Sequence, residues 1–198
     1  PEEFLSTLTS RGVNTNGLVT IVGGKSFFWE GSYHEDLMGR DTVTTELNVL
    51  EGWVPVVPEN SKSAKYVMLG NLDPSVQRSV LDQMSSRPDL VVLDTMNFWM
   101  DIAMDSLKEV IAKVDVLMIN DEEARQLTGF KTLPLAAAAV HKMGPKTVVI
   151  KKGEHGAIMF EEGKTFFSPA MPLEKVIDPT GAGDTFAGGF IGYLARLG

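Results

Sequence analysis

Short apolar runs alternate with amphipathic stretches over the last two thirds of the chain. Continuous apolar runs are typical of strands buried on both faces of a sheet, and four of them occur at 66–69 (YVML), 90–93 (LVVL), 116–119 (VLMI) and 147–150 (TVVI). Between them, stretches such as 74–84 and 103–114 have helical spacing. The alternation predicts βαβ units, and therefore a parallel sheet with helices on both faces.

The pattern changes after the fourth run. Residues 151–167 carry glycine turns between short runs, which indicates an antiparallel edge of the sheet. The last element is a helix from about 181 to 196, because Phe186, Phe190 and Leu194 recur at i, i+4 and i+8.

The first third has a different pattern. Residues 1–12 are expected to form a short helix of the core domain that ends at Gly12. Residues 18–33 contain two β-prone runs around Gly23-Gly24, which predicts a hairpin, and 42–49 predicts a further strand. Because apolar residues are few here, we expect 13–64 to form mainly a small β-sheet lid and 65–198 to form the α/β core.

Composition excludes several classes of protein. The net charge of −8 and the isoelectric point near 4.9 argue against nucleic-acid or anionic-membrane binding, which needs a basic surface. The absence of cysteine excludes disulfides and thiolate metal sites and fits a cytoplasmic protein. No apolar run reaches the roughly 18 residues of a membrane span. The chain begins with proline, and we expect it to be part of a longer protein.

Polar residues follow the apolar runs: Asn71, Asp94, Asn120, the pair Lys151 and Lys152, and Asp178. Ligands of open parallel sheets bind at the carboxyl ends of the strands. Carboxylates, amides and lysines at this edge suit a nucleotide phosphate and its divalent cation.

Two common phosphate-binding motifs are absent. The stretch GGKS at 23–26 ends like a P-loop, but Val19 stands where that motif needs glycine. The stretch GAGDTF fails the dinucleotide motif, because Phe186 occupies the place of its last glycine.

The stretch DPTGAGD at 178–184 offers a different phosphate site. A helix N-terminus has unpaired N–H groups and a partial positive charge, so it attracts anions. Gly181 and Gly183 would let a phosphoryl group approach the backbone, and Asp184 in the first turn would accept a proton from an attacking hydroxyl. An ordinary tight turn before a helix explains the bare tetrapeptide GAGD equally well.

The longer stretch DPTGAGDTFAGGF closely resembles the C-terminal signature of the PfkB carbohydrate kinases, which have the ribokinase-like fold. The resemblance implies an α/β three-layer αβα sandwich with a mostly parallel sheet and a small β-sheet lid. It also implies that Asp184 is the catalytic base and that the amides of Gly181, Ala182 and Gly183 form an anion hole for the transferred phosphoryl group.

Two more stretches resemble motifs of this family. NDEE at 120–123 is similar to its N-x-x-E motif, which implies that Asn120 lies near the nucleotide phosphates and that Glu123 orders Mg²⁺ through water. The same spacing also predicts a helix capping box. KKGEHG at 151–156 is similar to a nucleotide-binding loop, or is an ordinary hairpin; the residues implied in nucleotide binding are Lys151, Lys152, Gly153 and Gly156.

Weaker resemblances complete the site. Asp178 and Thr180 match the position where several members bind a monovalent cation such as K⁺. DTMNFW at 94–99 is similar to the D-x-N element of some sugar-acid kinases, with one residue more between Asp94 and Asn97. With Asn71, these two residues are the candidate substrate contacts.

The resemblance implies a kinase that moves the γ-phosphate of ATP to a hydroxyl of a sugar, sugar derivative or nucleoside, with Mg²⁺ required and a homodimer formed through the lid. Alternatives are a kinase for a vitamin-like heterocycle and a non-catalytic nucleotide or metabolite binder of the same fold. Family members have a further strand before the first helix and further elements after the last. We therefore expect the 198-residue chain itself to be poorly active.

Overall fold

The computed structural model describes residues 2–34 and 40–198 of the chain. The chain divides into two compact units, one formed by residues up to Ser63 together with Gln83–Ser86, the other by Ala64–Asp82 and Arg87–Gly198. Within the described residues, no helix is both long and apolar enough to cross a bilayer.

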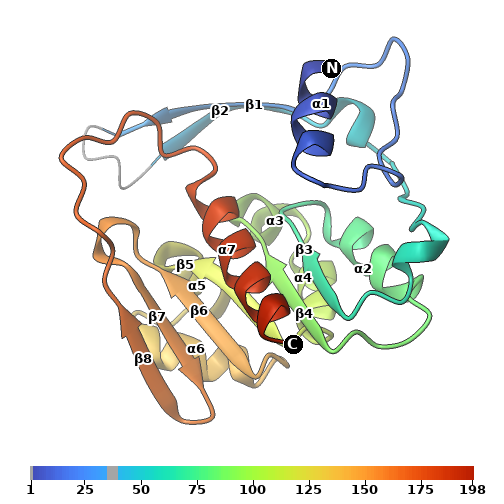
Figure 1. Cartoon of the computed structure of the whole chain (residues 1–198). Coiled ribbons are helices and arrows are strands. Elements are labelled where there is room, and N and C mark those ends of the chain that lie inside the picture. The colour runs from blue at the N-terminus through green and yellow to red at the C-terminus, as the bar shows by residue number, and fades with distance from the viewer. Residues whose placement is uncertain (1, 35–39) are drawn as a thin grey trace. The chain divides into compact units, whose positions relative to one another are not determined.

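The first unit contains one helix and a two-stranded sheet (Figure 1). Helix α1 (Glu2–Ser10) is followed by strands β1 (Phe28–Tyr33) and β2 (Arg40–Glu46), which pair antiparallel with a bulge at Glu30/Gly31. Two short 3₁₀ turns follow, η1 (Asn48–Leu50) and η2 (Glu59–Ser61). The strand expected at 42–49 is therefore present, but it begins two residues earlier and ends three residues earlier.

The hairpin expected around Gly23-Gly24 is wrong. Gly23 has φ 76° and the Gly24 N–H donates to the Ile21 carbonyl at 3.2 Å, so a tight turn exists, but the run before it is not a strand, and the run after it forms β1, which pairs with β2. After the turn the backbone pairs with the segment beyond β2, where the Val49 N–H donates to the Lys25 carbonyl at 3.2 Å. Pairing between β1 and β2 therefore replaces the expected pairing across the glycines.

The second unit is built on a six-stranded sheet whose strands lie in sequence order. The parallel strands are β3 (Tyr66–Leu69), β4 (Leu90–Asp94), β5 (Val116–Asn120) and β6 (Thr147–Lys151), and the antiparallel edge is β7 (Ala157–Glu161) and β8 (Lys164–Ser168). The expected mostly parallel sheet with an antiparallel edge is confirmed.

Helices cover both faces of this sheet. One face carries α2 (Pro74–Asp82), α3 (Asn97–Ile102), α4 (Met104–Ile111), α5 (Asp121–Thr128) and α6 (Leu133–His141). These helices connect successive parallel strands, and right-handed crossovers between strands in sequence order place them on the same face. The last helix, α7 (Ala182–Leu197), crosses the other face near β3 and β4 (Figure 1).

Alternate residues of each strand feed two separate cores. Leu93, Leu117 and Ile150 are fully buried against α3–α6, whereas Val92 and Met118 are buried on the side of Ala187 in α7. Successive side chains of a strand point to opposite faces, so a continuous apolar run supplies both cores. This is the physical reason why the runs at 90–93, 116–119 and 147–150 lack alternation.

The turn between β6 and β7 imposes a strict requirement for glycine at 156. Gly156 has φ 89°, and a Cβ atom there would lie 2.0 Å from the Ser168 carbonyl oxygen. Gly163, in the turn between β7 and β8, also has a positive φ of 76° but has open space around it. Gly163 is therefore favoured by its backbone conformation alone, whereas Gly156 is favoured by both its backbone conformation and the lack of space for a side chain.

We expect Gly156→Ala to lower the free energy of unfolding by roughly 3 kcal/mol or more, since it adds overpacking to an unfavourable left-handed conformation. Gly163→Ala, the matched control, should cost only about 1–2 kcal/mol for the conformation alone. Denaturant unfolding of the two variants measures the difference. Equal losses would show that the contact with Ser168 relaxes freely.

Candidate active site

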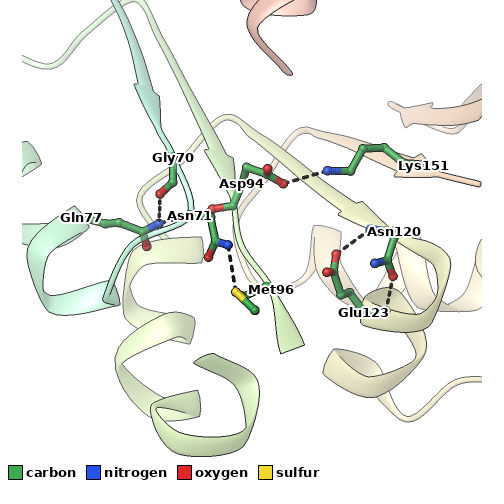
Figure 2. Close-up of polar contacts among 8 residues, drawn as sticks. All are labelled: Gly70, Asn71, Gln77, Asp94, Met96, Asn120, Glu123 and Lys151. Carbon is green, nitrogen blue, oxygen red and sulfur yellow. Dashed lines mark hydrogen bonds and ion pairs between the residues drawn. The ribbon is translucent and has the colours of Figure 1, made fainter. Parts of the chain in front are cut away.

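Polar side chains gather where the parallel strands end. Asp94 is the last residue of β4, Asn120 the last of β5 and Lys151 the last of β6. Asn120 pairs with Lys151 in the β5–β6 register, so the two lie side by side. Figure 2 shows these residues with Gly70 and Asn71, which follow β3. Strand ends far apart in sequence therefore form one edge, as the sequence predicts.

A buried ion pair joins two of these strand ends. Lys151 Nζ lies 3.0 Å from Asp94 Oδ1, and the two side chains are 18% and 6% exposed. Lys151 extends from β6 toward Asp94 (Figure 2). A buried carboxylate is costly unless it is paired, so Lys151 is the counter-ion that permits Asp94 to be buried. The sequence places both residues at the edge but does not predict the pair.

The electrostatics of Asp94 also involve α7. Burial raises the pKa of Asp94 above 3.8, the charge of Lys151 opposes this rise, and the charge of Asp184 adds to it. Asp184 stands in the first turn of α7, next in sequence to Gly183, whose backbone approaches Lys151.

Helix α7 begins with glycines for two different reasons. Gly181, its N-cap, has φ 77° and ψ 2°, a left-handed conformation that glycine adopts without strain. Gly183 faces Lys151, because a Cβ atom at 183 would lie 3.1 Å from Lys151 Nζ. Bare backbone at 183 thus lets the ammonium approach the first turn of the helix.

The three amides expected in an anion hole are not equivalent. The Ala182 N–H donates to the Pro179 carbonyl at 3.1 Å, while Gly181 supplies no side chain to cap the helix. The first N–H groups of a helix lack partners within it. The start of α7 is therefore a place where a ligand could accept hydrogen bonds, with the Ala182 amide engaged in a turn.

Helix α5 begins differently, with a complete capping box. The Glu123 N–H donates to Asn120 Oδ1 at 2.8 Å, and the Asn120 N–H donates to Glu123 Oε2 at 2.7 Å (Figure 2). Glu123 is only 4% exposed. The capping alternative raised by the sequence is therefore present, and one oxygen of Glu123 is engaged by the cap. Its role beside a metal remains a prediction.

The segment after β6 forms a compact turn. The 3₁₀ turn η3 (Gly153–His155) is closed by the Lys152 N–H donating to the Gly156 carbonyl at 2.8 Å and by the Gly156 N–H donating to Gly153 at 3.1 Å. Lys152 and Gly153 thus continue the same edge from Lys151. Their part in nucleotide binding remains a prediction.

The candidate substrate residues are only partly brought together. Asn71 accepts a hydrogen bond from Trp99 Nε1 at 2.9 Å and donates to Met96 Sδ at 2.9 Å, so it holds the loop after β4 (Figure 2). Asp94 faces Lys151, whereas Asn97 is exposed at the first turn of α3. Within the described part of the chain, no hydrogen bond joins Asn97 to the other two, and its role remains a prediction.

Gln77 on α2 belongs to this edge, although it was not among the residues predicted from the sequence. Its side chain is 2% exposed, and Nε2 donates to the Gly70 carbonyl at 2.7 Å and to the Asp94 carbonyl at 3.3 Å. It therefore joins the ends of β3 and β4. A polar residue on the sheet-facing side of an amphipathic helix is the signal that could have identified it.

The candidate monovalent-cation residues lie before α7. Both Asp178 and Thr180 are exposed, and the Thr180 N–H donates to Asp178 Oδ1 at 2.9 Å. Hydrogen bonds from the Thr180 side chain and backbone lower the pKa of Asp178 below 3.8. Among the residues that the structure describes, no group of three or more acidic, histidine or cysteine side chains lies close enough together to hold a metal ion.

The arrangement fits an anionic group such as a nucleotide phosphate. Lys151, the uncapped start of α7 and the bare backbone of Gly183 surround one place at the edge, and Asp184 is beside it. A cation, a helix N-terminus and a neighbouring carboxylate are the parts that a phosphoryl transfer requires.

Known proteins are similar to this chain in sequence and in fold. Residues 46–198 match the profile described as pfkB family carbohydrate kinase. A cytidine kinase of Thermococcus kodakarensis is 32% identical over 203 aligned positions, which cover 99% of this chain and 70% of that protein.

Two solved structures share the fold. A candidate ribokinase II from E. coli in complex with ATP and Mg²⁺ has a TM-score of 0.80 at 21% identity, over 100% of this chain and 66% of that one. A nucleoside kinase of Burkholderia thailandensis in complex with inosine has a TM-score of 0.77 at 19% identity, over 98% and 64%.

This chain belongs to the pfkB family of carbohydrate kinases, ATP-dependent phosphotransferases that act on hydroxyl groups of sugars and nucleosides. The ribokinase-like architecture expected from the signature is confirmed by the solved structures. The chain spans about two thirds of the length of the proteins it matches, 70% of the cytidine kinase and 66% and 64% of the two solved chains.

The pKa of Asp94 tests the geometry directly. We expect a carboxyl ¹³C titration to place it above 3.8, to show a lower value in Asp184→Asn and to show a higher value in Lys151→Met, because Asp184 raises and Lys151 lowers it. An Asp94 pKa that ignores Asp184 would show that α7 does not begin beside the pair.

The same shift makes stability depend on pH. The folded state holds the Asp94 proton more tightly than the unfolded state, so its contribution to stability is fully present below pH 3.8 and is lost as pH rises through the raised pKa. Asp94→Asn should remove this component from the unfolding free energy measured against pH.

Proposed function

We propose that the protein containing these residues transfers the γ-phosphoryl group of ATP to a hydroxyl of a nucleoside or sugar. The observation that carries this proposal is the position of Asp184 in the first turn of α7, next to Gly183, whose backbone approaches Lys151. A base, a cation and a helix N-terminus then face one place, which suits charge stabilisation of a transferring phosphoryl group.

Asp184 acts as the base in this proposal. The acceptor oxygen forms a bond to the γ-phosphorus, the bond from that phosphorus to the oxygen of ADP breaks, and the hydroxyl proton passes to Asp184. Asp184 is exposed at the helix start, where an acceptor hydroxyl can reach its carboxylate. The amides of Gly181 and Gly183 orient the phosphoryl oxygens, and the Ala182 amide joins them by leaving or sharing its turn bond with Pro179.

Magnesium supplies charge neutralisation between phosphate oxygens when it is bound. Glu123 is the residue of this chain that would order it through water, and Asn120 would lie toward the nucleotide phosphates. Glu123 Oε2 accepts the hydrogen bond of the cap, and a carboxylate has further lone pairs for a water molecule. The ATP and Mg²⁺ present in the E. coli relative support this assignment.

A nucleoside is the acceptor we infer first. The relative with 32% identity is a cytidine kinase, and the Burkholderia relative was solved with inosine. Asn71 and Asp94 are the proposed substrate contacts in the described structure, with Asn97 on the exposed start of α3. Sugars remain in the proposal, since the family as a whole acts on both.

Further parts of the proposal follow the resemblance. Residues 13–64 supply a lid for the substrate and a surface for a homodimer, and the helix at 1–12 belongs with the core. Asp178 and Thr180 bind a monovalent cation such as K⁺, for which the lowered pKa of Asp178 provides an ionised ligand. A cytoplasmic location is proposed because the reaction consumes ATP.

Turnover tests the proposal. We expect the full-length protein to release ADP with at least one member of a panel of nucleosides and sugars, and Asp184→Asn to lower kcat by about 10²–10⁴-fold with the Kd for ATP nearly unchanged. Asp105→Asn, an exposed aspartate in the first turn of α4, is the matched control and should keep wild-type kcat.

No ADP release above background with any acceptor would favour the non-catalytic binder. Wild-type kcat in Asp184→Asn would contradict the assignment of the base.

Glu123→Gln separates the metal role from the cap. Glutamine can accept the same hydrogen bond from the Asn120 N–H, so the unfolding free energy should change by less than about 1 kcal/mol. The Mg²⁺ concentration for half-maximal rate should rise roughly tenfold or more. Glu122→Gln, which removes an exposed charge from the same turn of α5, is the control. An unchanged Mg²⁺ dependence in Glu123→Gln would make Glu123 a capping residue only.

A further inference from the structure

We propose that Lys151 binds the γ-phosphoryl group of ATP directly, held in position by Asp94 across the edge of the sheet. The inference rests on the proposed function and goes beyond it, because it assigns one group of the transferred nucleotide to one side chain. The resemblance to the family implies Lys151 in nucleotide binding but does not say which part of the nucleotide it contacts.

The position of the ammonium carries the proposal. Lys151 Nζ is fixed on one side by Asp94 Oδ1 at 3.0 Å and on the other by the bare backbone of Gly183, where a Cβ atom would lie 3.1 Å away. An ammonium has three donors, and Asp94 accounts for one of them. An anionic group bound at the start of α7 could therefore accept a hydrogen bond from Lys151 without any rotation of the lysine side chain.

The exposure of the ion pair also points to a ligand at the lysine. Lys151 lies against the first turn of α7, at Gly183. Lys151 is 18% exposed, whereas Asp94 is only 6% exposed. The ammonium of Lys151 is therefore the group of the pair that remains accessible to a ligand, whereas the carboxylate of Asp94 is covered.

A second observation distinguishes this lysine from the one beside it. Lys151 is the last residue of β6 and its side chain points to the face occupied by α7, as its approach to Gly183 shows. Lys152 already lies outside the strand, and its backbone N–H closes the η3 turn on Gly156. Only Lys151 is placed by β6 against the start of α7.

The competing explanation is that Lys151 only neutralises the buried Asp94. Both explanations predict that Lys151→Met alone damages the protein, because it leaves a buried carboxylate without its counter-ion. The double variant Lys151→Met/Asp94→Asn separates them, since it removes both charges and with them the need for neutralisation. A purely structural lysine would become dispensable in that background.

The experiment measures the Kd of ATP and of ADP in Mg²⁺ by titration calorimetry on the full-length protein. The ratio of ADP Kd to ATP Kd reports the contribution of the γ-phosphate and needs no acceptor or turnover. We expect the double variant to regain the thermal stability lost in Lys151→Met, yet to show a ratio at least roughly tenfold lower than the wild type, as for a lost charge-assisted hydrogen bond.

The matched control is Lys113→Met/Asp82→Asn, which removes another lysine–aspartate pair, 3.2 Å long and about half exposed on each side. It should keep the wild-type ratio. A wild-type ratio in Lys151→Met/Asp94→Asn would overturn the proposal. A wild-type protein that binds neither nucleotide would overturn both this proposal and the proposed function.

The proposed function and the proposed contact of Lys151 can also fail separately. A protein whose ratio depends on Lys151 but which releases no ADP with any acceptor would contradict the proposed function and support the contact. Release of ADP with an acceptor, together with a ratio of ADP Kd to ATP Kd that does not change when Lys151 is replaced, would support the proposed function and contradict the contact.

Discussion

Parallel pairing of β3, β4, β5 and β6 is the constraint on which the rest of the second unit depends. Their carboxyl ends lie at one edge, so residues 57 positions apart, Asp94 and Lys151, meet in an ion pair. The pairing is possible because the runs are apolar on both faces and are covered by helices on both sides. Burial of the strands leaves only their ends for polar residues, and the site occupies those ends.

The two helix starts at this edge are used in opposite ways. Helix α5 closes its own N-terminus with the reciprocal hydrogen bonds of Asn120 and Glu123, and so stabilises itself. Helix α7 begins at a left-handed glycine that offers no capping side chain, and a lysine from β6 lies against its first turn instead. The cap stabilises α5 without a ligand. The uncapped N-terminus of α7 instead keeps hydrogen-bond donors and a partial positive charge available to a ligand. The same kind of element thus serves structure in one place and chemistry in the other.

Burial of Asp94 links stability to the proposed chemistry. A buried carboxylate needs a cation, and the cation that satisfies it is the one that α7 approaches. Glycine at 183 leaves room for the lysine head group, and glycine at 181 suits the left-handed backbone conformation. The glycines of the signature therefore have distinct physical reasons, which a motif alone does not separate.

The sequence by itself determined the elements that depend on local periodicity. It predicted the four buried strands, the antiparallel edge, the last helix and the edge at which polar residues collect, because apolar periodicity and strand direction are properties of short segments. It also carried the signature from which the family could be recognised. Where two local explanations competed, it left the choice open, as at Asn120 and Glu123.

Only the tertiary structure decided what depends on distant partners. The turn at Gly23-Gly24 is real, but the chain beyond it pairs with the segment after β2, which no local pattern specifies. The contact of Gln77 with the ends of β3 and β4, and the pair of Asp94 with Lys151, arise from strand order and helix placement. A residue's type limits the bonds it can form, but its partner is chosen by the elements that the fold places beside it.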